Sequence, residues 1–310
     1  MIKVYKKKIR DNKSSVSSKL TDIKGSLIYC IDPSIEETTE ISEKLGIDSS
    51  LIKDALDPYE VPRLEEDGDL IFVISSFPVK EDKENKLLSI PFALAVGENY
   101  VAVISSRHLF FLEEWFESGE NFVTTQKTKL VNLIFKKLME EYNKQLTIID
   151  REFHRISLAP GRISSEEITK LVWFEESLNL IIGDLVPTDA ILRNILSGKK
   201  MRLFEEDKEL IEDTVLYTEQ LMEMVKTNLK KISNLRSVYS ALLTDNLNNT
   251  MKLLAAITVV LTIPTIVASI YGMNINLPLQ NHPFAFGFII LFILVLSVVL
   301  VYLFIRNKWF

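Results

Sequence analysis

Four hydroxyl side chains recur at helical spacing within an uncharged, apolar stretch near the C-terminus. These residues are Thr258, Thr262, Thr265 and Ser269. On an α-helix they fall within a sector of about 60°. Two interpretations are open: the hydroxyls bond back to the carbonyl four residues earlier or pack at a helix interface, or they line a wet pathway. Met251 and Leu254 continue this face toward the N-terminus, and Asn248 lies somewhat off it.

The hydroxyl face belongs to one of two apolar runs that are long enough to cross a membrane. Residues 253–270 form the first run, followed by Tyr271-Gly272-Met273-Asn274, and residues 284–305 form the second. No charged residue occurs between Lys252 and Arg306. A helix needs about 20 apolar residues to cross the bilayer core, so both runs are predicted to be membrane spans.

The charged residues that flank the two runs predict their orientation. Lys252 precedes the first run, Arg306 and Lys308 follow the second, and the connecting residues 275–283 carry no Lys or Arg. Basic flanks stay in the cytoplasm, so the N- and C-termini are expected there and the short loop outside. Two helices cannot enclose a pore, so any pathway requires several copies of the chain, each contributing its first span.

Composition separates the rest of the chain from these spans. The chain holds 36 Lys and Arg against 42 Asp and Glu, and residues 251–310 hold three basic residues and no acidic ones. The first 250 residues therefore carry nine excess negative charges, which argues against a nucleic-acid partner. The single cysteine, Cys30, excludes an internal disulfide and any multi-cysteine metal site. No phosphate loop, HExxH or nucleophile elbow supports an enzyme.

Residues 1–125 have the pattern of an α/β domain. Buried strands are predicted at 26–31 and 70–75, and a hairpin at 87–96 and 100–105. Ser34 and Glu37 form a capping box for a helix that ends near Gly46. A second short helix is expected at 50–56. Polar connections are expected at 60–68 and 78–86.

Long helices follow. Apolar residues at helical spacing predict one helix over 126–157, and a second capping box at Ser164 and Glu167 begins another that runs to about residue 196, with an irregularity near Pro187. After Phe204 the next Gly or Pro in the sequence is Pro264. This predicts one helix that continues into the membrane. Its acidic first turns suit a helix N-terminus, and a cation contact there is the minor alternative. These acidic residues are Glu205, Glu206, Asp207, Glu209, Glu212 and Asp213.

The tetrapeptide Tyr271-Gly272-Met273-Asn274, at the outer end of the first of two C-terminal spans, resembles the signature of the CorA magnesium transporters. The short outer loop, the basic tail ending in KWF, the stretch 248–254 and the N-terminal pattern from Ile31 to Arg63 are also similar to that family. The resemblance spans nearly the whole chain. It implies an α/β N-terminal cytoplasmic domain, then long helices and two C-terminal transmembrane helices, assembled as a homopentameric funnel in the plasma membrane.

The resemblance also implies roles for individual residues. Asn274 forms a ring at the outer mouth and contacts the ion through its hydration water. The first span lines the pore, and Mg²⁺ is both the transported and the regulatory ion. The family's pore-lining positions fall on Asn248, Met251, Leu254, Thr258, Thr262 and Thr265, and Ser269 continues the hydroxyl face. The partners implied are four further copies of the chain, the lipid bilayer and divalent cations.

Together these patterns divide the chain into seven expected segments. They are an α/β domain (1–125), a helical hairpin packed on the funnel (126–200), the cytoplasmic part of the pore helix (201–252), the pore-lining span (253–274), the outer loop (275–283), the second span (284–305) and a basic cytoplasmic tail (306–310).

Two departures from the family pattern keep alternatives open. The outer loop has no carboxylate, and Ser237 occupies a position where some relatives place an Asp of a regulatory metal site. Glu81, Asp82 and Glu84 are candidates for its partner. The leading hypothesis is uptake of Mg²⁺, with Co²⁺ or Ni²⁺ also passing. The alternatives are transport of another divalent ion such as Zn²⁺, efflux, or a non-conducting membrane-tethered sensor.

Overall fold

The computed structural model describes the chain except for residues 12–13, 82–85, 119–121, 158–164, 200, 202, 276, 279–281, 308 and 310. The chain forms two compact units, Met1–Ser233 and Asn234–Phe310. The seven-segment division inferred from the sequence remains a prediction.

A seven-stranded sheet is the centre of the first unit. The strands are β1 (Ile2–Lys6), β2 (Ser15–Ser17), β3 (Ser26–Ile31), β4 (Arg63–Asp67), β5 (Leu70–Glu81), β6 (Lys86–Val96) and β7 (Tyr100–Ser105). Their order across the sheet is β2-β1-β3-β7-β6-β5-β4. All neighbours pair antiparallel except β3 and β7, which are parallel and in register from Ser26 opposite Tyr100 to Ile31 opposite Ser105. The long register of β5 with β6, from Ile71 opposite Val96 to Glu81 opposite Lys86, makes a ribbon that extends past the end of β7.

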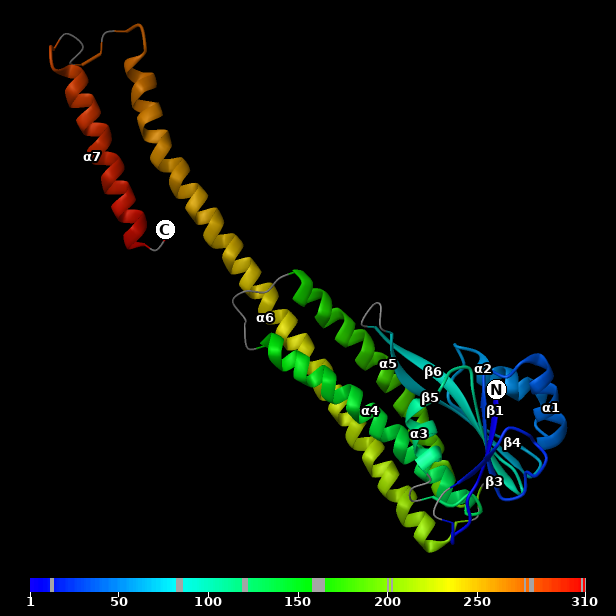
Figure 1. Ribbon diagram of the computed structural model, residues 1–310. Coiled ribbons are helices and arrows are strands. Elements are labelled where there is room, and N and C mark those ends of the chain that lie inside the picture. Colours follow the sequence, from blue (N-terminus) through cyan, green and yellow to red (C-terminus); the bar gives the residue numbers. More distant parts are fainter. Residues whose placement is uncertain are drawn as a thin grey trace. The chain divides into compact units, whose positions relative to one another are not determined.

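Two short helices, α1 (Ile35–Leu45) and α2 (Ser49–Leu56), cover one face of this sheet (Figure 1). The capping box predicted for α1 is present, because Ser34 accepts from the Glu37 backbone while the Glu37 side chain accepts from the Ser34 backbone. Gly46 ends α1 at φ 68°, a left-handed conformation that glycine adopts without steric cost. The helices and strands enclose an apolar cluster that includes fully buried Cys30.

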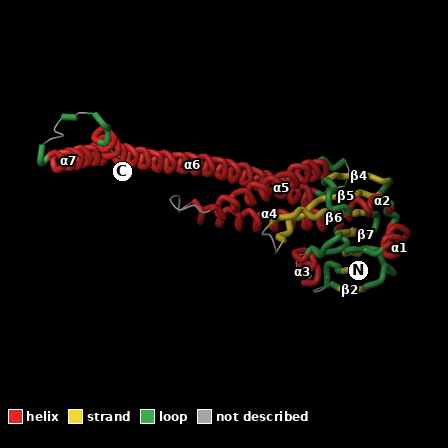
Figure 2. Tube along the Cα trace, turned by 90° about the horizontal axis from the view of Figure 1, so that it is seen from above, coloured by secondary structure: helices red, strands yellow, loops and turns green. Residues whose placement is uncertain are grey.

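The opposite face carries α3 (Phe110–Ser118), α4 (Lys127–Ser157) and α5 (Ser165–Leu196) (Figures 1 and 2). The Phe116 ring of α3 packs edge-on against Tyr29 of β3, with centroids 5.9 Å apart. The first part of α6 (Glu205–Tyr271) lies along α4. There the Lys231 ammonium pairs with the Asp150 carboxylate at 3.0 Å.

A buried polar network joins α4 and α5 to the sheet. The Asp184 carboxylate of α5 accepts from Ser89 Oγ of β6 at 2.8 Å and lies 3.0 Å from the Tyr142 hydroxyl of α4. The same hydroxyl is 2.9 Å from the Ser76 carbonyl of β5. Burial raises the pKa of Asp184 to about 6, although the hydrogen bonds from Ser89 and Tyr142 act to lower it.

The second unit consists of the rest of α6 and α7 (Ala285–Arg306). Both helices contain windows long and apolar enough to span a membrane, and almost none of these windows is buried. The predicted continuity of α6 is confirmed, because a single helix extends from Glu205 through Pro264 to Tyr271. Its first turn is acidic, as expected for a helix N-terminus.

Two predicted polar connections were wrong. Residues 63–67 form the edge strand β4 rather than a loop, and β5 continues through Pro78 to Glu81 rather than turning. Pro78 pairs with Ser89 and Pro91 with Ser76, beyond the residues at which β4 and β7 pair with these strands. Proline is compatible with a strand that has lost one neighbour, because its missing N–H then faces no partner.

Other differences concern whole elements. The strands β1 and β2 and the helix α3 were not predicted, and α5 is assigned as a continuous helix through Pro187. Ser164, the expected N-cap of α5, lies outside the described residues.

Candidate ion-conducting face

The three threonines of the hydroxyl face of α6 share one local geometry. Thr258 Oγ1 donates to the Leu254 carbonyl at 2.8 Å, and Thr262 Oγ1 donates to the Thr258 carbonyl at 2.7 Å. Thr265 Oγ1 donates to the Leu261 carbonyl at 3.1 Å. Each of these hydroxyls therefore has its only hydrogen committed to its own helix, as the first of the two sequence interpretations expected.

Back-bonding does not exclude a wet pathway. A hydroxyl that donates to a carbonyl keeps two lone pairs as acceptors, and the three threonines are at least partly exposed in the isolated chain. These three threonines thus offer hydrogen-bond acceptors and no spare donors. This polarity suits the outward-pointing hydrogens of water molecules that surround a cation.

Apolar side chains continue the face toward the N-terminus. Met251 is 59% exposed and Leu254 is 60% exposed, and Asn248 is also exposed. Among residues 253–271, all of which are described, Ala256 alone is buried. An apolar helix with this much free surface requires lipid or neighbouring helices around it.

The helix ends at the tetrapeptide. The Gly272 N–H bonds to the Ala268 carbonyl at 2.9 Å, and the Met273 N–H bonds to the Ile270 carbonyl at 3.2 Å. Gly272 is not among the residues with positive φ, but a Cβ there would lie 3.2 Å from the Ala268 carbonyl oxygen. Glycine suits this position because a side chain would crowd the Ala268 carbonyl oxygen, and not because the backbone is left-handed.

Asn274 lies beyond the helix end and is exposed. Among the described residues its side chain has no hydrogen-bond partner, so it caps none of the described carbonyls of α6. The amide is therefore free to contact a ligand. Asn276 and residues 279–281 of the outer loop lie outside the described residues.

Tyr271 connects the end of α6 to the outer loop and α7. Its hydroxyl lies 3.4 Å from the Pro278 carbonyl, at the long end of hydrogen-bonding distance. The ring also lines an apolar cleft of about 570 Å³ between α6 and α7. The other side chains of this cleft are Val267, Ile270, Phe288, Ile289 and Phe292. These contacts hold the tetrapeptide next to the start of α7.

The predicted regulatory metal site remains a prediction, because its candidate acidic side chains are not described. Asp82 and Glu84 lie outside the described residues, as does the side chain of Glu81, the last residue of β5. Ser237 is exposed on α6. Within the described part of the chain, no group of three or more His, Cys, Asp or Glu residues is arranged to hold a metal.

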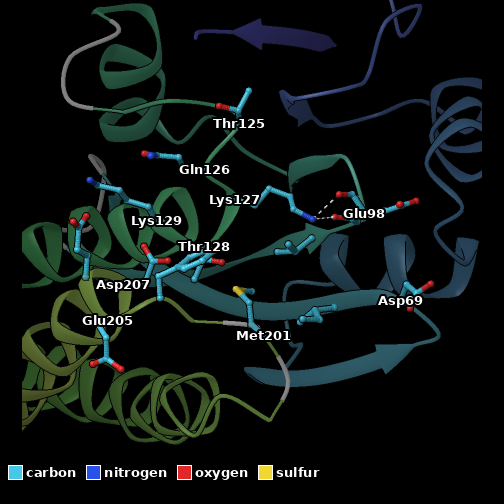
Figure 3. A pocket seen from close by; sticks show the side chains of 15 residues that line it. Asp69, Glu98, Thr125, Gln126, Lys127, Thr128, Lys129, Met201, Glu205 and Asp207 are labelled. Carbon is cyan, nitrogen blue, oxygen red and sulfur yellow. Dashed lines mark hydrogen bonds between the residues drawn. The ribbon is translucent and has the colours of Figure 1, made fainter. Parts of the chain in front are cut away.

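The acidic start of α6 faces a cavity of about 980 Å³ instead (Figure 3). Glu205 and Asp207 line it together with Asp69, but so does Lys127, whose ammonium donates to the carbonyls of Gly97 at 2.7 Å and Glu98 at 2.6 Å. Lysines lie among these carboxylates where α4 and α6 begin. The acidic cluster is therefore better explained as a favourable helix N-terminus than as a cation site.

Known proteins match this architecture. The family model described as CorA-like Mg²⁺ transporter protein matches residues 28–306. A cobalt/magnesium transport protein CorA from Methanocaldococcus jannaschii is 27% identical over 299 residues, covering 91% of this chain and 90% of that protein. A second, from Thermotoga maritima, is 23% identical over 282 residues, covering 87% and 78%. The complete structure of the CorA magnesium transporter from Methanocaldococcus jannaschii has a TM-score of 0.87 at 22% identity, covering 100% of this chain and 99% of that chain.

These matches define a membrane-transporter fold with two C-terminal apolar helices. The chain belongs to the family of CorA-like Mg²⁺ transporter proteins, since the family model covers most of its length. The resemblance inferred from the tetrapeptide and its context is thereby confirmed. The fold class is confirmed as well: an α/β domain, long helices and two C-terminal apolar helices.

Proposed function

We propose that this protein is a channel-type transporter that carries Mg²⁺, and also Co²⁺, across the plasma membrane into the cell. The N- and C-termini lie in the cytoplasm. The observation that carries this proposal is the exposed acceptor face of α6, which lies directly before an Asn274 that has no partner among the described residues. Membership of the CorA-like family gives the class of ion.

The pore is formed by five copies of the chain, with the first spans inside and α7 facing lipid. A lone hairpin would leave the hydroxyls of Thr258, Thr262 and Thr265 against hydrocarbon, where their free acceptors find no water. A ring of first spans removes this cost, because the hydroxyls then face a hydrated lumen. The number five rests on resemblance to the family.

Asn274 forms the first binding ring at the outer mouth. Mg²⁺ loses its water reluctantly and is usually bound with several waters retained. A neutral amide oxygen can accept hydrogen bonds from these waters without holding the ion too tightly to leave. Because the described part of the outer loop contains no carboxylate, Asn274 is the main polar group available for this role.

The ion then passes the hydroxyl face and an apolar constriction formed by Met251 and Leu254. Rings of exposed apolar side chains gate a pore by excluding water when it is narrow. Conduction needs no nucleotide hydrolysis, because a divalent cation gains about 4.6 kcal/mol for each 100 mV of inside-negative potential.

Intracellular Mg²⁺ closes the pore. The nine excess negative charges of residues 1–250 repel one another across the copies of an assembly. Bound Mg²⁺ reduces this repulsion and compacts the assembly. Glu81, Asp82 and Glu84 remain the candidate contacts for the regulatory ion.

Ion flux into proteoliposomes tests the proposed function. The purified protein is reconstituted, an inside-negative potential is imposed, and entry of Mg²⁺, Co²⁺, Ni²⁺ and Zn²⁺ is measured with metal-sensitive dyes. We expect potential-driven entry of Mg²⁺ and Co²⁺. Selective flux of Zn²⁺ would indicate a transporter of another ion, and the absence of any flux would favour a non-conducting sensor.

A further inference from the structure

The chain changes from one face of the sheet to the other between the neighbouring parallel strands β3 and β7. After β3 it enters α1 on one face, whereas after β7 it enters α3 on the opposite face, where Phe116 meets Tyr29 (Figure 1). Both strands end at the same edge, since Ile31 pairs with Ser105. In α/β sheets, ligands bind outside the carboxyl ends of strands at such a switch point.

A cavity of about 880 Å³ lies at this edge. Its floor is formed by Ile31 and Asp32 after β3 and by Ser106 and Arg107 after β7. Asp32 has φ 40°, a conformation that costs a non-glycine residue free energy and that recurs at binding sites.

Three further elements form the walls. The β5–β6 ribbon contributes residues 77–80, the start of α3 contributes Phe110, Phe111 and Glu114, and α4 contributes Glu141 and Lys144. The volume is within the range of small-molecule sites, about 300–1,000 Å³. All of these residues belong to the first unit.

The cavity offers unpaired cationic groups. Among the described residues, the side chains of Arg107 and Lys80 have no hydrogen-bond or ion-pair partner, and both are exposed. Lys144 is paired with Glu141 at 2.9 Å.

At the start of α3 the N–H groups of Leu112 and Glu113 both bond to the Leu109 carbonyl. The N–H groups of Phe110 and Phe111 precede them and have no carbonyl four residues earlier within the helix, and such groups favour an anion.

An aromatic surface lies beside these groups. Phe110 is 70% exposed, and its ring stacks on His108 with centroids 5.6 Å apart and planes 16° apart. Phe111 packs on Phe77 with centroids 6.0 Å apart. An exposed aromatic face next to free cations suits a ligand that combines a planar ring with an anionic group.

We propose that this cavity is a binding site for a nucleoside phosphate. The phosphate contacts Arg107 and Lys80, and the base stacks on Phe110. Asp32 follows a strand end and has no side-chain partner among the described residues, so its carboxylate accepts from the ribose hydroxyls. This site shares no residue with the proposed ion pathway and does not rest on the proposed transport function.

Equilibrium dialysis with the full-length protein in detergent tests this proposal. The probes are ATP, adenosine and inorganic triphosphate, in EDTA so that no Mg²⁺ complex forms. We expect ATP to bind at least about tenfold more tightly than either fragment, because both its phosphates and its base are contacted. Arg107→Ala should weaken ATP binding by about tenfold or more, as expected for loss of a hydrogen bond to a charged group. Phe110→Ala should weaken it as well.

Matched controls separate the site from general effects. Arg10→Ala removes an exposed cation at the opposite edge of the sheet, and Tyr59→Ala removes a 91% exposed ring that follows α2. Both should leave ATP binding unchanged. The proposal is overturned if ATP does not bind saturably, if Arg107→Ala binds ATP normally, or if triphosphate binds as tightly as ATP. The experiment measures ATP binding rather than ion flux. It therefore tests the cavity even if the protein does not transport ions.

Discussion

The Thr262 hydroxyl donates to the backbone carbonyl of Thr258 at 2.7 Å. This bond fixes the hydroxyl hydrogen along the helix and leaves the oxygen lone pairs pointing away from it. The same arrangement holds at Thr258 and Thr265. The three threonines are therefore acceptors at fixed positions, and their role depends on the oxygen atoms rather than on hydroxyl donors.

The first prediction follows from this arrangement. Thr262→Val keeps the branched shape but removes the oxygen, so Mg²⁺ flux in proteoliposomes should fall severalfold because hydration water loses an acceptor. Thr262→Ser keeps the oxygen and should conduct close to the unmutated rate. Thr250, which also bonds back to the carbonyl four residues earlier, lies about 90° from the centre of the face. Thr250→Val is thus the matched control, and an equal loss of flux in both valine variants would contradict the acceptor role.

A second prediction concerns the buried Asp184. Its pKa is raised to about 6 chiefly by burial, above the value of about 3.9 expected for an unfolded chain. The folded state then binds its proton more tightly, so the contribution to stability is present below about pH 4 and is lost as pH rises to about 6. The loss is about 3 kcal/mol.

Thermal unfolding of the full-length protein measures this effect. Asp184→Asn cannot ionise, so its Tm relative to the unmutated protein should rise between about pH 4.5 and about pH 7. Asp69 is exposed, and Asp69→Asn is the control for removal of a surface carboxylate. A difference in Tm between Asp184→Asn and the unmutated protein that does not change with pH would mean that the Asp184 carboxyl titrates normally.

A third prediction concerns assembly. The exposed apolar surface of α6 and α7 and the hydroxyl face both require neighbours. Native mass measurement in nanodiscs should give one symmetric species, with five copies expected from the family. A stable monomer or dimer would rule out the pore.

A fourth prediction concerns regulation by Mg²⁺. Limited proteolysis in millimolar Mg²⁺ should cut residues 1–250 more slowly than proteolysis in EDTA, because the ion reduces repulsion among their nine excess negative charges. An added monovalent salt of equal ionic strength is the control for simple screening. Identical digestion in Mg²⁺ and EDTA would count against a regulatory ion.

The sequence predicted the elements whose signals are local. The capping box at Ser34 and Glu37, the left-handed Gly46 and the uninterrupted α6 each depend on residues close together in the chain. The strand β4, with the charged sequence RLEED, could not be found this way, because its place is set by pairing with β5. The extension of β5 through Pro78 likewise depends on which strands lie beside it.

The two candidate sites differ in the same way, because only one of them has a local signal in the sequence. The hydroxyl face followed from spacing alone, and the back-bonding of its threonines is the local consequence of placing them in a helix. The cavity at the end of β3 and β7 gave no sequence signal. Asp32, Lys80 and Arg107 are far apart in the chain, and only the sheet topology brings them to one edge.

We propose that Asn274 is the residue that first holds the hydrated ion at the mouth of the pore. The alternative is that Asn274 serves only to end α6, a role in which glycine is an equal substitute. Mg²⁺ flux should therefore be compared in proteoliposomes that contain the unmutated protein, Asn274→Gly or Asn274→Ala, after native mass measurement shows equal assembly. Both variants should lose uptake. Uptake by Asn274→Gly at close to the unmutated rate would contradict this role of Asn274.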